Sequence, residues 1–212
     1  MEEKDVTKTG TTTLAMECKD GVVIATETRA TMGHLIAHKE TKKLYKIDEH
    51  IALATAGLVG DLQVLARYLT AEANLYRLKR DNKIPVKSAA TLMSNILNQR
   101  KFYPYYVQLI LAGYDSSGGH VYSLDAAGGA IPDKYTSGGS GSPYVFGVLE
   151  DAYKEDITTS EGVDIAIRAI HAATSRDSAS GGKINVAIIT KDGFKEVPNE
   201  EVAKKREKIA KK

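Results

Sequence analysis

Gly10 and Thr11 are the clearest candidates for reactive residues, and they open a short polar run that leads into an apolar segment. If the bond between them stays intact, Thr11 begins a β-branched edge strand, because threonine suits a pleated backbone. If that bond is cut, Thr11 carries a hydroxyl and a free α-amine on one residue. An α-amine has an ordinary pKa of roughly 7.7 to 8.0, so it can take the hydroxyl proton and activate the oxygen as a nucleophile. The two residues alone leave both interpretations open.

Three further segments carry groups that could assist such a nucleophile. Glu27 ends an apolar segment two residues before Arg29, as either an exposed strand end or an orienting partner of the nucleophile. Lys43 follows Lys42 and precedes an apolar run, so it either snorkels to solvent or places an ammonium beside a hydroxyl and favours its deprotonated form. Gly57 joins a strand pattern to a helix pattern, where it provides either a tight connection or a bare N–H for an oxyanion.

Two loops of small residues, 138–142 and 176–182, raise the possibility of phosphate binding. Neither is followed by the Gly-Lys-Ser/Thr of a P-loop, and neither matches a dinucleotide fingerprint in a strand-loop-helix setting. The single cysteine and the 5 histidines show no paired spacing of metal ligands. We therefore expect neither a metal nor a cofactor.

The elements that must position these groups follow from hydrophobic periodicity and turn residues. Alternating or continuous apolar runs predict strands over residues 11–18, 22–27, 44–47, 50–56, 107–114, 120–124 and 185–190. Apolar steps of three and four residues, Pro85 and a capping-box pattern at 158–161 predict helices over 58–81, from 85, from 142, from 158 and over 199–210. Grouped hairpins and grouped helix pairs predict an α+β fold, a four-layer αββα sandwich of two antiparallel sheets flanked by helix pairs.

Composition limits the class of protein further. A chain of 212 residues with 42% hydrophobic side chains can form one domain with a substantial core. Cys18 has no intrachain partner, and residues 1–10 lack the apolar run of a signal peptide, so a cytoplasmic location is expected. No stretch approaches the roughly 20 apolar residues of a membrane span. Residues 204–212 hold six basic residues and one acidic residue without interleaved aromatics, which favours a solvated helix end over nucleic-acid binding.

Taken in chain order, these segments closely resemble the β subunits of proteasomes, specifically the archaeal type. The resemblance extends from Thr11 to about Pro198 and rests on motifs at 10–13, 25–29, 42–44, 56–61, 125–129, 139–142 and 176–182. It implies the N-terminal nucleophile hydrolase fold and a threonine-type endopeptidase. Residues 1–10 would be a propeptide that the chain removes itself, and residues 11–212 a single catalytic domain with a basic C-terminal helix.

The resemblance also implies a role for each candidate residue. Thr11 would be the nucleophile, released by autocatalytic cleavage of the bond to Gly10. Glu27 would hold Lys43, whose positive charge would help to activate Thr11, and the Gly57 N–H would stabilise the oxyanion. The residues expected to orient the Thr11 amine and relay protons are Ser140, Asp177 and Ser180.

The substrate implied by the resemblance is an unfolded polypeptide bound as an added strand through its main chain. None of the positions expected to contact it is charged, which predicts cleavage mainly after apolar or uncharged residues. Thr55 stands where a larger apolar residue is common in the family, so the preferred side-chain size stays open. The expected substrate-binding positions are Ala30, Thr31, Thr41, Tyr45, Thr55, Val59 and Gln63.

The implied partners are copies of this chain in homo-heptameric β rings, stacked between rings of α subunits through which a regulatory ATPase acts. Nucleic acid and membranes are not expected as partners. Two alternatives remain. A purely structural β-ring subunit is disfavoured because every site residue is present, and an N-terminal nucleophile hydrolase acting on a small amide is disfavoured by the full series of motifs.

Overall fold

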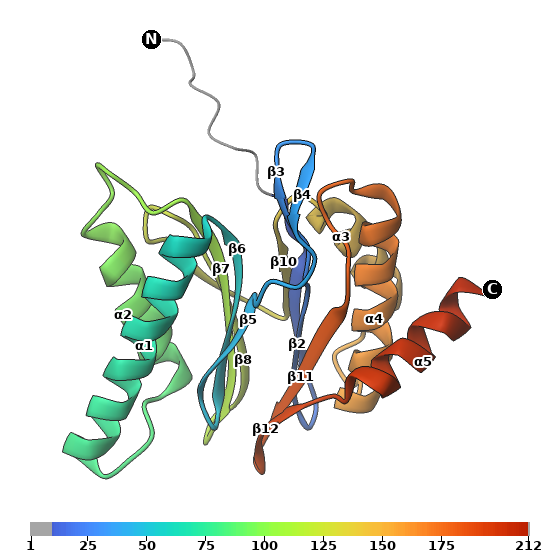
Figure 1. The fold of residues 1–212 in the computed structure, drawn as a ribbon. Helices are drawn as coiled ribbons and strands as arrows, with labels where there is room; N and C mark the ends of the chain where they lie inside the picture. The colour runs from blue at the N-terminus through green and yellow to red at the C-terminus, as the bar shows by residue number, and fades with distance from the viewer. Residues whose placement is uncertain (1–9, 212) are drawn as a thin grey trace.

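The computed structural model describes residues 10–211, so the predicted propeptide, except for Gly10, lies outside the described residues. Two five-stranded sheets lie face to face, and helices cover the outer side of each sheet (Figure 1). A separate two-stranded hairpin projects at one end of the sandwich. The predicted four-layer αββα architecture is confirmed.

The first sheet has the strand order β10-β1-β2-β11-β12, and neighbouring strands are antiparallel. All seven residues of β2 are buried, because one face of the sheet meets helices and the other meets the second sheet. Burial on both faces explains why this strand reads as a nearly continuous apolar run. The strands are β1 (Thr13–Cys18), β2 (Gly21–Glu27), β10 (Tyr135–Gly138), β11 (Ile184–Thr190) and β12 (Gly193–Glu196).

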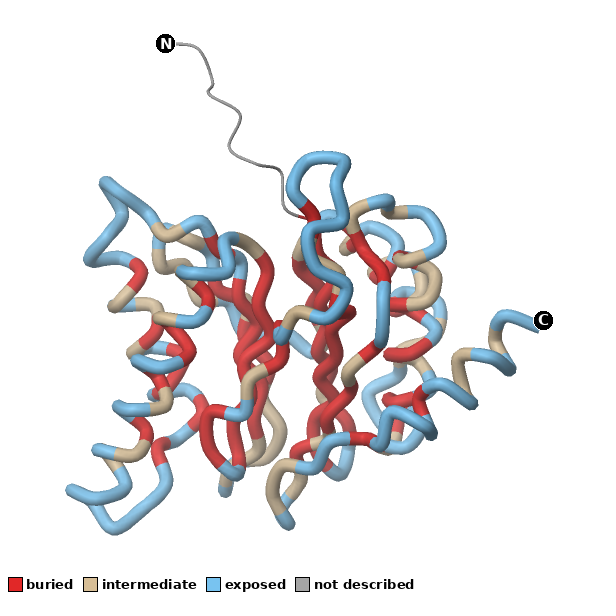
Figure 2. The backbone as a smooth tube through the Cα atoms, in the orientation of Figure 1, coloured by how far each residue is buried: buried red, intermediate tan, exposed pale blue. Residues whose placement is uncertain are grey.

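The second sheet has the order β5-β6-β7-β8-β9, again antiparallel throughout. Small side chains, including Ala15, Ala54 and Ala112, fill part of the layer between the two sheets and allow them to approach closely. Figure 2 shows the buried backbone concentrated in these facing sheets. The strands are β5 (Leu44–Asp48), β6 (Ile51–Gly57), β7 (Val107–Asp115), β8 (Gly118–Leu124) and β9 (Ala130–Asp133).

Helices α1 (Val59–Arg80) and α2 (Val86–Asn98) pack on the second sheet. Helices α3 (Ser142–Ala152), α4 (Thr159–Arg176) and α5 (Asn199–Ala210) pack on the first. The predicted capping box at the start of α4 is present, with reciprocal hydrogen bonds between Thr158 and Glu161. The first sheet is thus covered by three helices, where the sequence pattern predicts a pair followed by a polar terminal helix.

Strand register brings the candidate residues to one end of the sandwich. Thr13 pairs with Thr26, so the start of β1 lies beside Glu27 at the end of β2. Glu27 in turn pairs with Ile184, which places the loop before β11 at the same end. In the second sheet the Thr55 N–H donates to the Lys43 carbonyl over 3.0 Å, so β5 begins where β6 ends.

The sequence pattern misses several short strands. No strand or helix is predicted over residues 28–43, yet they contain the hairpin β3 (Ala30–Met32) and β4 (Leu35–His38). All four residues of β4 are exposed, so no alternation of buried and exposed positions marks it. Strands β9, β10 and β12 are also missed, because strands of four residues are too short to show a period.

Candidate active site

Thr11 lies two residues before β1 and is only 4% exposed. The Thr11 nitrogen is the amide of the peptide bond to Gly10. The Thr11 hydroxyl donates a hydrogen bond to the Gly10 carbonyl over 2.6 Å and accepts one from Lys43 Nζ over 3.1 Å. The hydroxyl oxygen is therefore held between a cation and the carbonyl of the preceding residue.

Gly10 lies where any side chain would displace its neighbours. A Cβ at this position would lie 1.8 Å from the Ala179 Cβ and 2.9 Å from the Ser140 Oγ. The Gly10 N–H donates to the Thr31 Oγ1 over 3.1 Å, which ties the chain before Thr11 to strand β3. The close approach of the 176–182 loop thus requires glycine before the bond that is predicted to break.

Glu27 and Lys43 form a buried ion pair through Glu27 Oε1, with 0% and 5% side-chain exposure. The carboxylate also accepts N–H donors from Thr12 (3.2 Å), Arg29 (2.6 Å) and Gly181 (3.0 Å), so its oxygens are well satisfied. Lys43 Nζ donates in addition to the Arg29 carbonyl at 2.5 Å. These bonds fix the lysine so that its remaining donor faces Thr11.

Burial sets the electrostatics of Lys43. Removal from water lowers its pKa below the ordinary value, whereas the negative charge and hydrogen bond of Glu27 act in the opposite direction. Asp177 also acts to raise the pKa of Lys43, and Arg29 to lower it. A lysine balanced in this way can stabilise negative charge on Thr11 Oγ1 and exchange a proton more readily than a solvated lysine.

Asp177 is the centre of a second polar network. Its Oδ2 accepts hydrogen bonds from Ser140 and from Ser180, each over 2.6 Å. Ser140 accepts the Thr11 N–H over 3.2 Å, which places it beside the nitrogen that the predicted cleavage would release as an amine. Ser180 also shares a 2.7 Å hydrogen bond with the Thr12 hydroxyl. Hydrogen bonds link Ser180 to the Thr11 N–H through Asp177 and Ser140.

Gly57, the predicted oxyanion donor, ends β6 with a φ of 128°. A Cβ there would lie 2.1 Å from the Tyr106 carbonyl oxygen, so both the conformation and the space require glycine. The predicted strand-to-helix turn is confirmed, because α1 starts two residues after Gly57. The role of the Gly57 N–H stays a prediction.

The predicted substrate positions divide into two groups. Ala30, Thr31 and Thr41 lie on or next to the β3–β4 hairpin, and Thr31 contacts Gly10 directly. Thr55 is fully buried and donates its hydroxyl to the Lys43 carbonyl over 3.1 Å, so it holds the backbone of Lys43 in place. The second group lies on β5 and α1: Tyr45 belongs to β5, and Val59 and Gln63 belong to the first turns of α1.

Tyr45 and Gln63 line a groove of about 540 Å³ between β5 and α1. Three basic residues, Lys42, Lys46 and Arg67, line the same groove. The predicted substrate positions are themselves uncharged, but the groove that Tyr45 and Gln63 line also contains these three basic side chains. A groove with these neighbours disfavours a positively charged substrate side chain.

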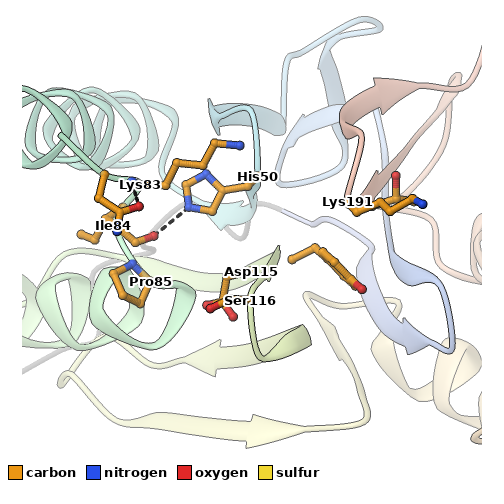
Figure 3. A pocket seen from close by; sticks show the side chains of 10 residues that line it. His50, Lys83, Ile84, Pro85, Asp115, Ser116 and Lys191 are labelled. Atoms are coloured by element: carbon orange, nitrogen blue, oxygen red, sulfur yellow. Dashed lines mark hydrogen bonds between the residues drawn. The ribbon is translucent and has the colours of Figure 1, made fainter.

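A second cavity, of about 500 Å³, is drawn in Figure 3. Its lining residues His50 and Asp115 lie just before β6 and at the end of β7, so the cavity is at the opposite end of the strands from Thr11. His50 Nε2 makes a 2.7 Å hydrogen bond to the Ile84 carbonyl there, and Asp115 and Lys191 line the same space. None of the predicted site residues belongs to this cavity. Within residues 10–211, no group of three or more potential ligands could hold a metal ion, and no helix qualifies by length and hydropathy as a membrane span.

Sequence reasoning missed two backbone groups and one side chain of the site. The Arg29 carbonyl and the Gly181 N–H each bond one partner of the Lys43–Glu27 pair, and the Thr12 hydroxyl joins the Asp177 network. The motifs at 25–29 and 176–182 contain the first two, but side-chain chemistry alone gives no signal for a backbone group.

A four-layer αββα sandwich with a threonine before its first strand, beside a buried lysine–glutamate pair, defines the class of N-terminal nucleophile hydrolases. The model of the family described as "Proteasome subunit" matches residues 7–189. The chain therefore belongs to the proteasome subunit family.

Three archaeal relatives carry the name proteasome subunit beta. That of Methanothermobacter thermautotrophicus is 52% identical over 99% of this chain and 100% of the relative. Those of Thermoplasma acidophilum and Methanosarcina mazei are 53% and 52% identical, covering 95% and 93% of this chain and 96% and 94% of the relatives. The resemblance to archaeal β subunits inferred from the motifs is confirmed, whereas the roles of individual residues stay predictions.

Proposed function

We propose that this chain is a catalytic β subunit of a proteasome core, and that Thr11 cleaves peptide bonds of unfolded polypeptides after its own release from Gly10. The observation that carries the proposal is the contact of Lys43 Nζ with Thr11 Oγ1, which ties the hydroxyl to the buried pair with Glu27. An ammonium at this distance favours the deprotonated hydroxyl and stabilises the negative charge that develops on attack.

Maturation would begin with attack of Thr11 Oγ1 on the Gly10 carbonyl carbon. The Gly10–Thr11 C–N bond breaks as the nitrogen takes a proton, which leaves an ester between the Gly10 acyl group and Thr11 Oγ1. Water then hydrolyses the ester, releasing residues 1–10 with a terminal carboxylate and Thr11 with a free hydroxyl and amine. The 2.6 Å contact between the hydroxyl and the Gly10 carbonyl supports this first step.

Peptide hydrolysis would repeat the chemistry on a substrate. The free Thr11 amine accepts the hydroxyl proton as Oγ1 attacks the substrate carbonyl, and the proton then passes to the departing amine. The resulting acyl ester is hydrolysed by water, which restores Thr11. Ser140 lies 3.2 Å from the Thr11 nitrogen and bonds Asp177, so it would orient the amine throughout.

The direct test replaces the nucleophile in chains assembled with their α partner. Thr11→Ala should abolish both cleavage at Gly10 and hydrolysis of fluorogenic peptides, while the particle still assembles. Thr91→Ala serves as the matched control, because its hydroxyl bonds only to the Lys87 carbonyl within α2 and lies outside the site. Peptidase activity retained by Thr11→Ala would favour the rival in which this chain is structural and another component is catalytic.

Substrate preference is proposed to be mainly apolar or uncharged on the amino side of the cleaved bond. The basic groove beside Tyr45 and Gln63 supports discrimination against arginine. Reporter peptides ending in Leu, Tyr, Arg or Asp should therefore be cleaved least efficiently after Arg. Dominant cleavage after Arg would contradict the proposal.

For assembly we propose homo-heptameric β rings between α rings, fed by a regulatory ATPase, in the cytoplasm. Membership of the proteasome family supports the core assembly, and heterologous contacts that close into a ring are the geometry that it needs. Native mass spectrometry of the co-expressed chains should return seven β copies per ring. A different number would overturn the stoichiometry without affecting the chemistry.

The basic C-terminal helix is better explained by packing than by nucleic acid. Arg206 donates to the Gly182 carbonyl over 2.8 Å, and Lys205 pairs with Asp164 over 2.5 Å. Deletion of residues 204–212 should leave nucleic-acid binding at its background level. If the deletion removed measurable binding and spared the peptidase, the helix would have a separate function.

A further inference from the structure

The connection between α2 and β7 presents an unusual group of exposed aromatic side chains. Phe102 is 84% exposed, Tyr103 is 88% exposed and Tyr106 is 50% exposed. Large apolar side chains exposed singly are normal, but adjacent ones on one segment indicate an interaction surface. We call residues 102–106 the aromatic loop.

The aromatic loop is held in place at its base. The Tyr106 N–H donates to Asp61 Oδ2 over 2.9 Å, and the Tyr106 carbonyl accepts the Leu58 N–H over 2.9 Å. Tyr105 packs against the core between α1, α2 and the second sheet. The exposed rings are therefore displayed from a fixed frame, which reduces the entropy lost when they bind a partner.

The residues that directly follow the aromatic loop reach the surroundings of Thr11. Gln108, at the start of β7, accepts the Gly139 N–H over 2.8 Å. Gly139 lies directly against Thr11, since a Cβ on it would be 2.0 Å from the Thr11 carbonyl oxygen. Gly57 pairs with Val107, the residue that follows the loop. The loop thus rises from the same end of the sandwich as the active site, above α2 in Figure 1.

We propose that the aromatic loop binds an apolar segment of the unfolded polypeptide substrate, outside the residues next to the cleaved bond. The proposal rests on the proposed peptidase function. An unfolded chain exposes apolar side chains that a folded protein buries, and aromatic rings can contact them without sequence-specific geometry. Continuity with the Gly57–Thr11 end of the molecule favours the substrate over other occupants.

Charge refines the kind of segment that fits. Arg100 lies over the Tyr105 ring at 5.6 Å and Lys101 over the Phe102 ring at 5.5 Å. Each cation is held beside an aromatic face and has no ion pair among residues 10–211. Segments that place an acidic residue next to apolar ones should therefore bind best.

The test compares long and short substrates on particles assembled with the α partner. The double variant Phe102→Ser/Tyr103→Ser should raise KM for reduced, carboxymethylated α-lactalbumin roughly tenfold, which is the loss expected for two aromatic contacts. KM and kcat for a fluorogenic tetrapeptide should not change. The control Leu78→Ser removes a side chain of similar exposure, 82%, near the other end of α1 and should alter neither substrate.

The outcomes separate this proposal from the peptidase proposal. Equal KM values for the long substrate in variant and wild type overturn the substrate-binding role, while normal tetrapeptide cleavage leaves the peptidase intact. Failure of the double variant to form particles would instead assign the loop to contacts between subunits and also overturn the proposal.

Photocrosslinking provides an independent measurement that does not remove the aromatic surface. A benzophenone side chain in place of Tyr103 should capture labelled carboxymethylated α-lactalbumin upon irradiation. An apolar peptide carrying one acidic residue should compete more strongly than its lysine counterpart. Crosslinks confined to neighbouring subunits would overturn substrate binding at this loop.

Discussion

The exchange Glu27→Gln keeps the shape of a fully buried side chain and removes only its charge. The carboxylate accepts four donors, three backbone N–H groups and Lys43 Nζ, whereas an amide must turn its own NH₂ toward one of them. Leaving a buried partner uncompensated costs about 3 to 5 kcal/mol of unfolding free energy. In a chain of this size that corresponds to a fall in Tm of roughly 6 to 20 °C.

The same exchange should affect catalysis through Lys43. Glu27 opposes the lowering of the Lys43 pKa by burial, so without it the lysine loses its proton at lower pH. Peptidase activity should fall by about 10²- to 10⁴-fold at neutral pH. What remains should decline at a lower alkaline pH than in the wild type, because the deprotonated lysine no longer stabilises charge on Thr11.

The sign of the stability change with pH provides a second readout. A lysine whose pKa is lower in the folded than in the unfolded state destabilises the fold while it is protonated. The free energy of unfolding therefore rises as pH increases from the folded-state pKa to the unfolded-state pKa. The stability lost in Glu27→Gln should therefore shrink at alkaline pH.

The assay measures kcat/KM on particles built from chains that begin at Thr11, so that failed processing does not mask the result, and measures Tm on the unassembled chain. Glu17→Gln is the matched control, because it removes the exposed pair with Lys134, worth at most about 1 kcal/mol. Wild-type kcat/KM in Glu27→Gln would contradict the role given to the Glu27 charge, as would a Tm change no larger than that of the control.

Three further predictions concern the surroundings of the site. Gly10→Val should slow propeptide cleavage roughly 5- to 100-fold by displacing Ala179, as followed by intact mass over time, and unchanged processing would refute the packing argument. Ser140→Ala should lower kcat roughly ten- to hundredfold with little change in KM, because the Thr11 amine loses an orienting partner; a change in KM alone would contradict that role. Burial, assisted by nearby acidic groups, raises the pKa of Cys18 to about 12, so iodoacetamide at pH 8 should alkylate it only after unfolding, and rapid labelling of the folded chain would contradict this.

Long, regular segments were predictable because burial imposes a period on them. The terminal helix over 199–210 is found as predicted, and the capping box marks the start of α4. Strand β2 was recognisable because both of its faces are covered, so its residues form an apolar run. The exposed β3–β4 hairpin and the short β10 carry no such pattern, since neighbouring strands, and not their own hydrophobicity, hold them.

The residues of the candidate site could be predicted from the sequence, but the contacts between them could not. Glu27, Lys43 and Asp177 could be singled out because charged groups interrupt apolar or small-residue segments. Their geometry depends on contacts across more than a hundred residues, such as Thr11 with Ser140, that only the tertiary fold creates. Thr55 shows the limit most clearly, because its burial and its bond to the Lys43 carbonyl follow from strand register.

The most direct test of the account is the N-terminus of this chain after assembly with its α partner, determined by intact mass and N-terminal sequencing. We predict a chain that begins at Thr11, having lost residues 1–10, in particles that hydrolyse peptides. A peptidase-active particle in which the chain still carries Gly10 would contradict the claim that the Thr11 hydroxyl and its own amine perform the chemistry.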